Sequence, residues 1–170
     1  MKKKYNRFWT RRLQNKIMNP QTIKQYIKNK NLDVEFFEHR DIDALTTNGA
    51  VLATGAKPEN ILKVLLFIDN GGNKAIAVIQ GSRKVDTKKI PGLKKPDLAS
   101  PDQVKKFLNG QIGGLAPIAL PDGIKKIIDK GILELDFVYG SGGSRYTSIK
   151  LNPKIILEQP NCMIMDIAKE

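Results

Sequence analysis

The stretch that decides the fold is Asn60-Ile-Leu-Lys-Val-Leu-Leu-Phe-Ile-Asp69. Its apolar run is interrupted only by Lys63, and its length and β-branched content predict a strand that is buried on both faces. An unpaired ammonium inside such a strand is costly, so we expect Lys63 to reach a cleft or to meet an anion from the protein or from a ligand. The alternative is that Lys63 lies near the strand end and extends to water along its methylene stem.

The segments around this strand predict a mixed α/β, α+β-like single domain. The turn residues at 69–73 predict a hairpin to a second strand at 74–80, which makes the strand with Lys63 central in its sheet. Hydrophobic periodicity and capping residues predict further strands at 32–38, 135–139, 146–151 and 162–167, and helices at 20–30, 50–53, 101–108 and 153–157. Residues 124–129 fit a strand or a short helix, and 131–135 remain undecided. We therefore expect a central mixed, strongly curved sheet flanked by short helices.

The positive charge of the chain is concentrated at its N-terminus. The chain has 170 residues and a formal net charge of +12, yet residues 1–30 carry ten Lys or Arg and no acid, whereas residues 31–170 carry nineteen against seventeen acids. Aromatic rings at Tyr5, Phe8 and Trp9 lie within this run. Such an arm suits a polyanion, because neutralised phosphates release counterions and rings can stack on unpaired bases. The alternative is a solvated tail. We divide the chain into a basic extension at residues 1–18 and a domain at 19–170.

Cysteine and histidine each occur once, as Cys162 and His39. These counts exclude an intrachain disulfide, a multi-cysteine metal site and a His-rich metal centre, and we expect no cofactor. Cys162 lies in an apolar segment and is interpreted as a buried filler rather than a nucleophile. No apolar stretch has the length of a signal peptide or of a membrane span, so a cytoplasmic protein is the default expectation.

A glycine-rich loop at residues 109–118 is the second candidate for a site. Its paired Gly113 and Gly114 let the backbone approach a ligand closely and direct N–H groups at an anion or a carbonyl. The letters fit neither a P-loop nor a dinucleotide fingerprint, and a plain turn between two elements is the alternative. His39, at the exit of the strand predicted at 32–38, is either a polar rim residue or a ligand contact.

Taken in order, these motifs resemble the YbaK and prolyl-tRNA-synthetase-associated editing domain family. The resemblance covers about residues 20 to 168 and leaves most of the basic arm outside. It rests on His39, Thr46-Thr47, Ile61-Leu-Lys-Val-Leu65, Gly113-Gly-Leu-Ala-Pro117 and Phe137-Val-Tyr-Gly-Ser-Gly-Gly-Ser-Arg145.

The resemblance implies a trans-editing aminoacyl-tRNA deacylase, with alanyl or cysteinyl esters of tRNA for proline as the expected substrates. In the family the lysine anchors the charged end of the substrate, and the loop backbone fixes the ester while hydrolysis depends on the substrate's own groups. It implies catalytic roles for Lys63, Gly113, Gly114 and Pro117. It implies substrate contacts at His39, Thr46, Thr47, Leu115, Ala116, Gly143, Ser144 and Arg145. The implied partners are the aminoacylated 3′ end of tRNA and prolyl-tRNA synthetase, with no membrane and no metal.

Physical reasoning agrees with this implication, because an aminoacyl ester is already activated. Positioning and backbone N–H groups at the developing oxyanion can then provide much of the rate gain without an acid–base pair. The chain departs from the family pattern at three places: Val64 follows the lysine where Thr or Ser is frequent, Ala116 precedes the proline where Ser is frequent, and Lys150 stands where an acid is common. The alternative is a non-catalytic module of the same fold that binds tRNA or a synthetase.

Overall fold

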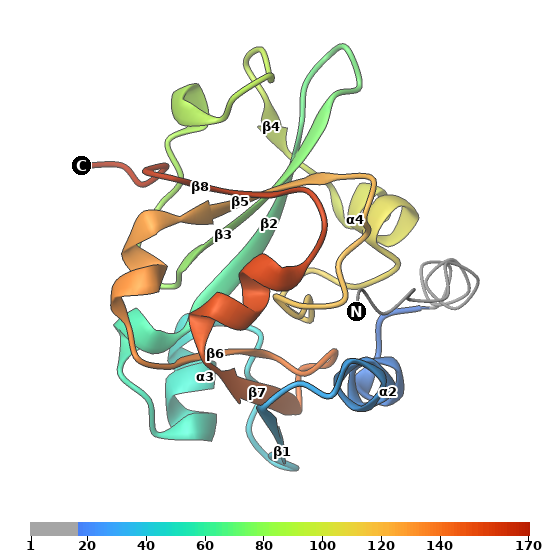
Figure 1. The fold of residues 1–170 in the computed structure, drawn as a ribbon, viewed down its shortest axis with the longest axis vertical. Helices are drawn as coiled ribbons and strands as arrows, with labels where there is room; N and C mark the ends of the chain where they lie inside the picture. The colour runs from blue at the N-terminus through green and yellow to red at the C-terminus, as the bar shows by residue number, and fades with distance from the viewer. Residues whose placement is uncertain (1–16) are drawn as a thin grey trace, which may run out of the picture.

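The computed structural model describes residues 17–170, which form two β-sheets and several short helices (Figure 1). Most of the predicted basic arm, residues 1–16, lies outside the described residues. The strands are β1 (Val34–Glu38), β2 (Leu62–Ile68), β3 (Lys74–Gln80), β4 (Asp97–Leu98), β5 (Lys125–Asp129), β6 (Val138–Ser141), β7 (Thr147–Leu151) and β8 (Cys162–Met165). The α-helices are α2 (Pro20–Lys30), α3 (Thr47–Thr54) and α4 (Pro101–Leu108), and 3-10 helices occupy η1 (Pro58–Asn60), η2 (Thr87–Lys89), η3 (Lys130–Glu134) and η4 (Pro153–Glu158).

The larger sheet is mixed and has the strand order β4-β2-β3-β5-β8. The pairs β4–β2 and β2–β3 are antiparallel, whereas β3–β5 and β5–β8 are parallel. The smaller sheet has the order β1-β7-β6 and is antiparallel throughout. In Figure 1 the larger sheet fills the upper part of the molecule and the smaller sheet the lower part, with α2 and α4 on one side.

The two sheets meet at one point and then separate. Ile61, directly before β2, forms a parallel bridge with Tyr139 of β6. Beyond this bridge β2 continues in the larger sheet, and the short β4 pairs with β2 only at Phe67 and Ile68. The earlier part of β2 therefore has a partner strand on one side only, and the prediction that this strand is central was wrong for the half that carries Lys63. The sequence of the strand could not show this, because the number of residues over which β2 pairs with β4 depends on residues far away in the sequence.

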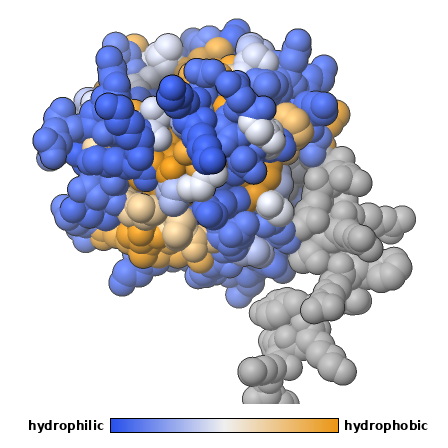
Figure 2. All heavy atoms as spheres, turned by 90° about the horizontal axis from the view of Figure 1, so that it is seen from above, coloured by the Kyte–Doolittle hydropathy of each residue, from blue (hydrophilic) through white to orange (hydrophobic). Residues whose placement is uncertain are grey.

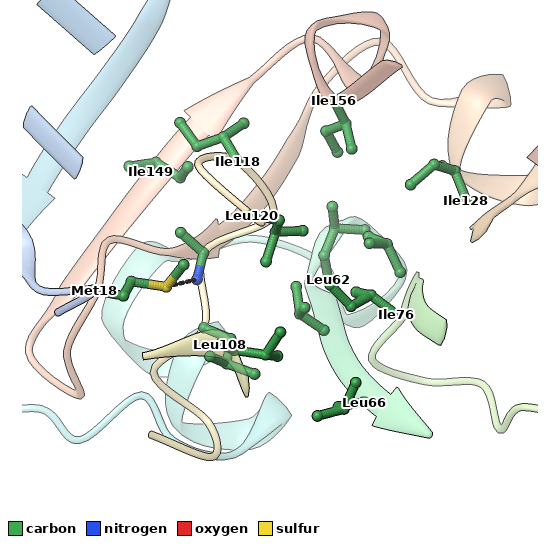
Figure 3. Close-up of a cluster of buried hydrophobic side chains, with 14 of the residues drawn as sticks. Met18, Leu62, Leu66, Ile76, Leu108, Ile118, Leu120, Ile128, Ile149 and Ile156 are labelled. Carbon is green, nitrogen blue, oxygen red and sulfur yellow. Dashed lines mark hydrogen bonds between the residues drawn. The ribbon is translucent and has the colours of Figure 1, made fainter. Parts of the chain in front are cut away.

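The main hydrophobic core lies between the two sheets and the helices (Figure 3). The larger sheet contributes Leu62, Leu66 and Ile76, and the smaller sheet contributes Ile149. The loop at 118–120 contributes Ile118 and Leu120, and the 3-10 helix η4 contributes Ile156, which Figure 3 shows beside them. A second cluster covers the other face of the larger sheet. The smaller sheet has its inner face in the main core.

A second lysine, Lys126 of β5, is fully buried with 0% of its surface exposed. Its ammonium donates hydrogen bonds to the carbonyl oxygens of Pro121, Ile124 and Pro160 at 2.6, 3.1 and 2.9 Å. Burial lowers the pKa of Lys126. Three main-chain dipoles thus replace the water that this charge has lost, and the side chain fixes two loops to the end of the sheet.

Helix capping signals located the helices well. Asn19 and Ser100 each form a capping box, and Pro20 and Pro101 occupy the first turn of α2 and α4. Gly55 ends α3 in the left-handed conformation, as predicted. The undecided segment at 131–135 lies in the 3-10 helix η3, and residues 124–129 contain the strand β5.

The fold class, a mixed α/β single domain with sheets and short helices, is confirmed. The strands divide into two sheets, where one central sheet was expected, because β6 leaves β2 after the bridge at Ile61. The strong curvature expected for the sheet stays a prediction. On the face seen in Figure 2, hydrophilic side chains surround several apolar patches.

Candidate active site

A pocket of about 230 Å³ lies in the fork where β2 and β6 separate. Its walls are mostly apolar and come from β2, β4, α3, α4, β6, β7 and two loops. The lining residues are Ala44, Leu45, Thr46, Thr47, Ala50, Ile61, Leu62, Lys63, Val64, Leu65, Leu66, Leu98, Ala99, Val104, Ile112, Gly113, Leu115, Tyr139, Gly140, Ser141 and Ser148. Because six consecutive residues of the β2 region line it, the pocket follows the strand along its edge.

The edge of β2 offers main-chain polar groups to this pocket. The carbonyl of Leu66 accepts a hydrogen bond from Ala99 N at 2.8 Å, so it points to the side where β4 lies. Main-chain groups of alternate residues in a strand point to the same side, so the N–H and C=O of Val64 and the C=O of Leu62 point into the pocket, whereas the Leu62 N–H belongs to the bridge between Ile61 and Tyr139. Buried main-chain groups require partners. A ligand ester or water molecules can supply them here.

Lys63 lines the pocket, and its side chain is half-buried on the opposite face of β2 from Leu62 and Val64. Its ammonium donates a hydrogen bond to the main-chain carbonyl of Arg83 at 2.7 Å. Burial lowers the pKa of Lys63, and the nearby charge of Lys84 lowers it further. The sequence predicted a cleft or an anion for this cation, and the structure places Lys63 at a pocket, with a neutral main-chain carbonyl as its hydrogen-bond partner.

Arg83, whose main-chain carbonyl accepts from Lys63, is held through its side chain by a buried acid. The Arg83 guanidinium lies 3.6 Å from the carboxylate of Asp129, whose side chain is fully buried. Asp129 also accepts hydrogen bonds from Gly131 N at 3.2 Å and Ile167 N at 3.0 Å. The position of the Lys63 ammonium is therefore connected to the C-terminal segment through Arg83 and Asp129.

The paired glycines of the loop have different roles in the geometry. Gly113 lines the pocket and has φ +77°, and a Cβ there would lie 2.8 Å from Leu45 Cδ2 and 3.0 Å from Leu45 O. Gly114 lies outside the wall, donates a hydrogen bond to Gln111 O at 3.0 Å, and has no heavy atom within 3.4 Å of an added Cβ. Only Gly113 therefore requires the absence of a side chain.

The rest of the loop is anchored away from the pocket. A Cβ on Gly140 would lie 2.5 Å from Pro117 Cδ, so the proline packs directly on β6. Ala116 is fully buried and donates its N–H to the sulfur of Met18 at 3.3 Å, the dashed line in Figure 3. Pro117 and Ala116 thus hold the loop, and Leu115 is the loop residue besides Gly113 and Ile112 that reaches the pocket.

The wall opposite β2 is built by the segment before α3. Thr46 caps α3 by accepting a hydrogen bond from Gly49 N at 3.0 Å, and Thr47 donates one to Gly81 O at 3.4 Å. The carbonyl of Arg145 accepts from Ala44 N at 2.8 Å, and its guanidinium lies 3.6 Å from the carboxylate of Asp43. Arg145 thus stays outside the pocket and fixes the segment that forms its wall.

One serine of the wall is held from behind by the single histidine of the chain. Ser148 of β7 lines the pocket with 3% of its surface exposed, and its Oγ lies 2.9 Å from His39 Nε2. His39 Nδ1 lies 2.8 Å from the carbonyl of Ile42. Since a carbonyl only accepts, Nδ1 carries the proton, and in the neutral ring Nε2 accepts from the Ser148 hydroxyl. The lone pairs of Ser148 Oγ are then left for a donor in the pocket.

The structure thus brings together five of the predicted site residues, namely Lys63, Gly113, Leu115, Thr46 and Thr47. His39 reaches the wall through Ser148, whereas Gly114, Ala116, Pro117, Gly143, Ser144 and Arg145 lie behind it. Gly143, at φ +102°, packs on the backbone of Asn19, and Ser144 bonds to Thr147. Ser148, Ser141 and Tyr139 were not predicted as site residues. Residues two apart in a strand lie on the same face, and this spacing of Tyr139 and Ser141, with Ser148 on the neighbouring strand, is the sequence signal that could have identified them.

Among residues 17–170 no group of three or more His, Cys, Asp or Glu side chains is arranged to hold a metal ion. In the same part of the chain, no helix has both the length and the apolar character needed to cross a membrane. Cys162 is half-buried, and burial raises the pKa of its thiol. A raised pKa reduces the thiolate fraction. The side chain is only half-buried, so the interpretation of Cys162 as a buried filler was wrong about its burial.

The fold and the pocket define a mixed α/β domain with one small, mainly apolar site at an open strand edge. The chain belongs to the aminoacyl-tRNA editing domain family, which it matches over residues 41–158. It is 29% identical over 133 residues to the uncharacterized protein YwhH of Bacillus subtilis (strain 168), covering 76% of this chain and 82% of that protein.

Two further comparisons agree with this assignment. The chain is 24% identical over 128 residues, 74% of its length, to EbsC of Enterococcus faecalis (strain ATCC 700802 / V583), 78% of which is covered. EbsC is named as a candidate Cys-tRNA(Pro)/Cys-tRNA(Cys) deacylase. The fold is similar to the crystal structure of a candidate trans-editing enzyme for prolyl tRNA synthetase, with a TM-score of 0.78 over 89% of this chain and 97% of that one. At 20% identity this last likeness shows the fold alone.

Proposed function

We propose that the protein is an aminoacyl-tRNA deacylase that hydrolyses alanyl or cysteinyl esters on tRNA for proline, acting as a separate protein. The observation that carries the proposal is the small pocket that joins Lys63, Gly113 and the open edge of β2. Family membership and the name of EbsC support the reaction class. The name of EbsC supports tRNA for proline as the RNA partner, and prolyl-tRNA synthetase is proposed as the protein partner.

The size of the pocket supports a small aminoacyl group. Its volume of about 230 Å³ is below the range of roughly 300–1,000 Å³ that is usual for sites of drug-sized ligands. Leu45, Val64 and Leu115 narrow it with apolar side chains. The methyl side chain of alanine or the –CH2SH side chain of cysteine fits such a space. A synthetase site discriminates poorly between amino acids whose side chains differ by a small apolar group.

Hydrolysis in this pocket depends on positioning more than on protein acids and bases. The lining residues from the described part of the chain include no Asp, Glu, His or Cys. The main-chain N–H group of Val64, on the open edge of β2, can donate to the ester oxygen as negative charge develops on it. A water molecule then attacks the carbonyl carbon, assisted by the substrate's own ribose hydroxyl next to the ester; the bond between the acyl carbon and the ribose oxygen breaks, and the proton lost by the water ends on that ribose oxygen. Cleavage releases the amino acid and restores the free ribose hydroxyl.

Lys63 and Ser148 are assigned to binding. The Lys63 ammonium provides the single positive charge of the lining and attracts the phosphate of the terminal nucleotide. Ser148 Oγ, whose proton is directed to His39, presents lone pairs that accept from the α-ammonium of the aminoacyl group. The basic extension at residues 1–18 is proposed to hold the tRNA electrostatically.

A panel of charged tRNAs tests the proposal. The wild-type protein should hydrolyse Ala-tRNA or Cys-tRNA for proline and leave Pro-tRNA intact. Lys63→Ala should lower kcat/KM by about 100-fold or more, as expected when an ester is no longer positioned. Lys88→Ala is the matched control, because Lys88 is an exposed cation outside the pocket wall and its removal should change kcat/KM by less than about threefold.

Two results would contradict the proposal in different ways. Unchanged turnover by Lys63→Ala would remove Lys63 from the site. Salt-dependent binding of tRNA without hydrolysis of any aminoacyl ester would favour the non-catalytic module, in which the fold serves binding alone.

A further inference from the structure

The outer face of the smaller sheet carries a cluster of exposed aromatic rings. Strand pairing places Glu35, Lys150 and Tyr139 in one row across β1, β7 and β6, and Phe37, Ser148 and Ser141 in the next. Their neighbours along each strand, such as Ile149 and Val138, face the main core. The two rows therefore lie on the face away from that core.

Three rings on this face contact one another. The ring centroids of Phe37 and Tyr139 are 6.3 Å apart, and Phe137 meets Tyr139 edge to face at 5.9 Å. Phe37 and Phe137 are 37% and 40% exposed. The Lys150 ammonium lies 4.6 Å from the centroid of Phe137, and Asn60 holds the Phe137 carbonyl at 2.8 Å. Lysine–ring pairs also occur at Phe36 and Phe107, but here the cation lies beside three grouped rings, two of them exposed.

This aromatic face is continuous with the pocket. Tyr139, the central ring, also lines the pocket, and so do Ser141 and Ser148 from the second row. In an aminoacyl-tRNA only the ribose separates the ester from the terminal base. An ester held against β2 therefore brings the unpaired end of the RNA to the mouth of the pocket, where Tyr139 and its two neighbouring rings lie.

We propose that Phe37, Tyr139 and Phe137, with Lys150 beside them, form a stacking platform for the unpaired 3′-terminal bases of tRNA. This inference rests on the proposed function. Aromatic faces stack on any base, whereas the ammonium of Lys150 meets the phosphate between two nucleotides. The occupant is a single-stranded nucleic acid end, because a cation beside flat exposed rings complements an anionic chain of planar bases.

The test uses an uncharged RNA hairpin with an unpaired 3′ end whose terminal adenine is replaced by 2-aminopurine, a base whose fluorescence falls on stacking. Addition of the full-length wild-type protein should quench the fluorescence. Phe137→Ala and Phe37→Ala should weaken binding by about 5- to 150-fold and reduce the quenching. Phe107→Ala is the matched control, because Lys74 lies 4.4 Å from that ring in the same arrangement but Phe107 is outside the pocket wall.

The outcomes separate this inference from the proposed function. Wild-type affinity and quenching in both Phe137→Ala and Phe37→Ala would overturn the platform, even if the protein deacylates its substrate. Quenching by the wild type, loss of quenching in both variants and no change in Phe107→Ala would support it, even if no ester is hydrolysed. A conservative Phe137→Leu variant, with its folding checked by thermal unfolding, should also lose quenching, because it keeps apolar packing but has no ring.

Discussion

Replacing Gly113 or Gly114 with alanine tests which of the two adjacent glycines the pocket requires, because the two variants are expected to differ in stability and in activity. At Gly113 the backbone is left-handed, which costs a residue with a side chain about 1–2 kcal/mol. The new methyl group would also lie 2.8 Å from Leu45 Cδ2 and 3.0 Å from Leu45 O, and overpacking of this kind costs about 1–3 kcal/mol. Gly113→Ala should therefore lower the free energy of unfolding by about 2–5 kcal/mol.

At Gly114 neither cost applies. Its backbone is not among the positive-φ glycines, and the nearest atom to an added methyl group is Gln111 O at 3.5 Å, an ordinary contact. Gly114→Ala should change stability by less than about 1 kcal/mol, and restricting the unfolded chain makes a small gain the expected sign. The two variants differ by one position and carry the same added atoms.

The assay combines urea unfolding with deacylation of Ala-tRNA for proline at a temperature where both variants are folded. Relief of the contact at Gly113 must displace Leu45, a wall residue, and a displacement of about 1 Å can lower the rate about 100-fold. Gly114→Ala should keep nearly wild-type activity. Equal stability and equal activity of the two variants would refute the assignment of Gly113 as the glycine that the pocket requires.

Three further predictions concern other parts of the molecule. Lys126→Met should lower the free energy of unfolding by at least about 1–3 kcal/mol, because buried carbonyls lose their donor. Burial lowers the pKa of Lys126, so the stability of the wild type should rise with pH between that lowered value and the ordinary lysine value. Urea unfolding at a series of pH values measures this rise, and the same rise in the variant would contradict the assignment to Lys126. Ser148→Ala should lower kcat/KM about 10- to 150-fold while the exposed Ser82→Ala does not, and trapping of an acyl group on Ser148 would show a nucleophile in place of a binding residue. Deleting residues 1–16, which contain seven Lys or Arg, should weaken tRNA binding and flatten its dependence on salt in a titration, whereas an unchanged slope would mean that the arm is a solvated tail.

Local sequence signals predicted the elements because their causes are local. The capping boxes at Asn19 and Ser100 and the turn at residues 69–73 depend on neighbouring residues, and they placed α2, α4 and the β2–β3 hairpin. The run around Lys63 correctly drew attention to a half-buried cation at the pocket. The buried Lys126 gave no such signal, because it follows another lysine and its three acceptors come from loops that only the fold brings near.

The site could be predicted only where it is continuous in sequence. The loop with Gly113 and the segment with Thr46 and Thr47 both line the pocket, as the motif order suggested. The contact between His39 and Ser148 joins residues 109 positions apart and depends on the register of β1 with β7. The pocket itself exists because two strands separate after a single bridge, a property that no local pattern encodes.

The thioether of Met18, which contacts the glycine loop, comes from outside the segment that matches the family. A protein trimmed to residues 41–158 would lack this sulfur, and the Ala116 amide would have to find another acceptor in a dry interior. It would also lack β1 and β8, leaving β7 and β5 with bare edges that invite intermolecular association. Residues on both sides of the homologous segment therefore pair with its edge strands and satisfy one of its buried amides.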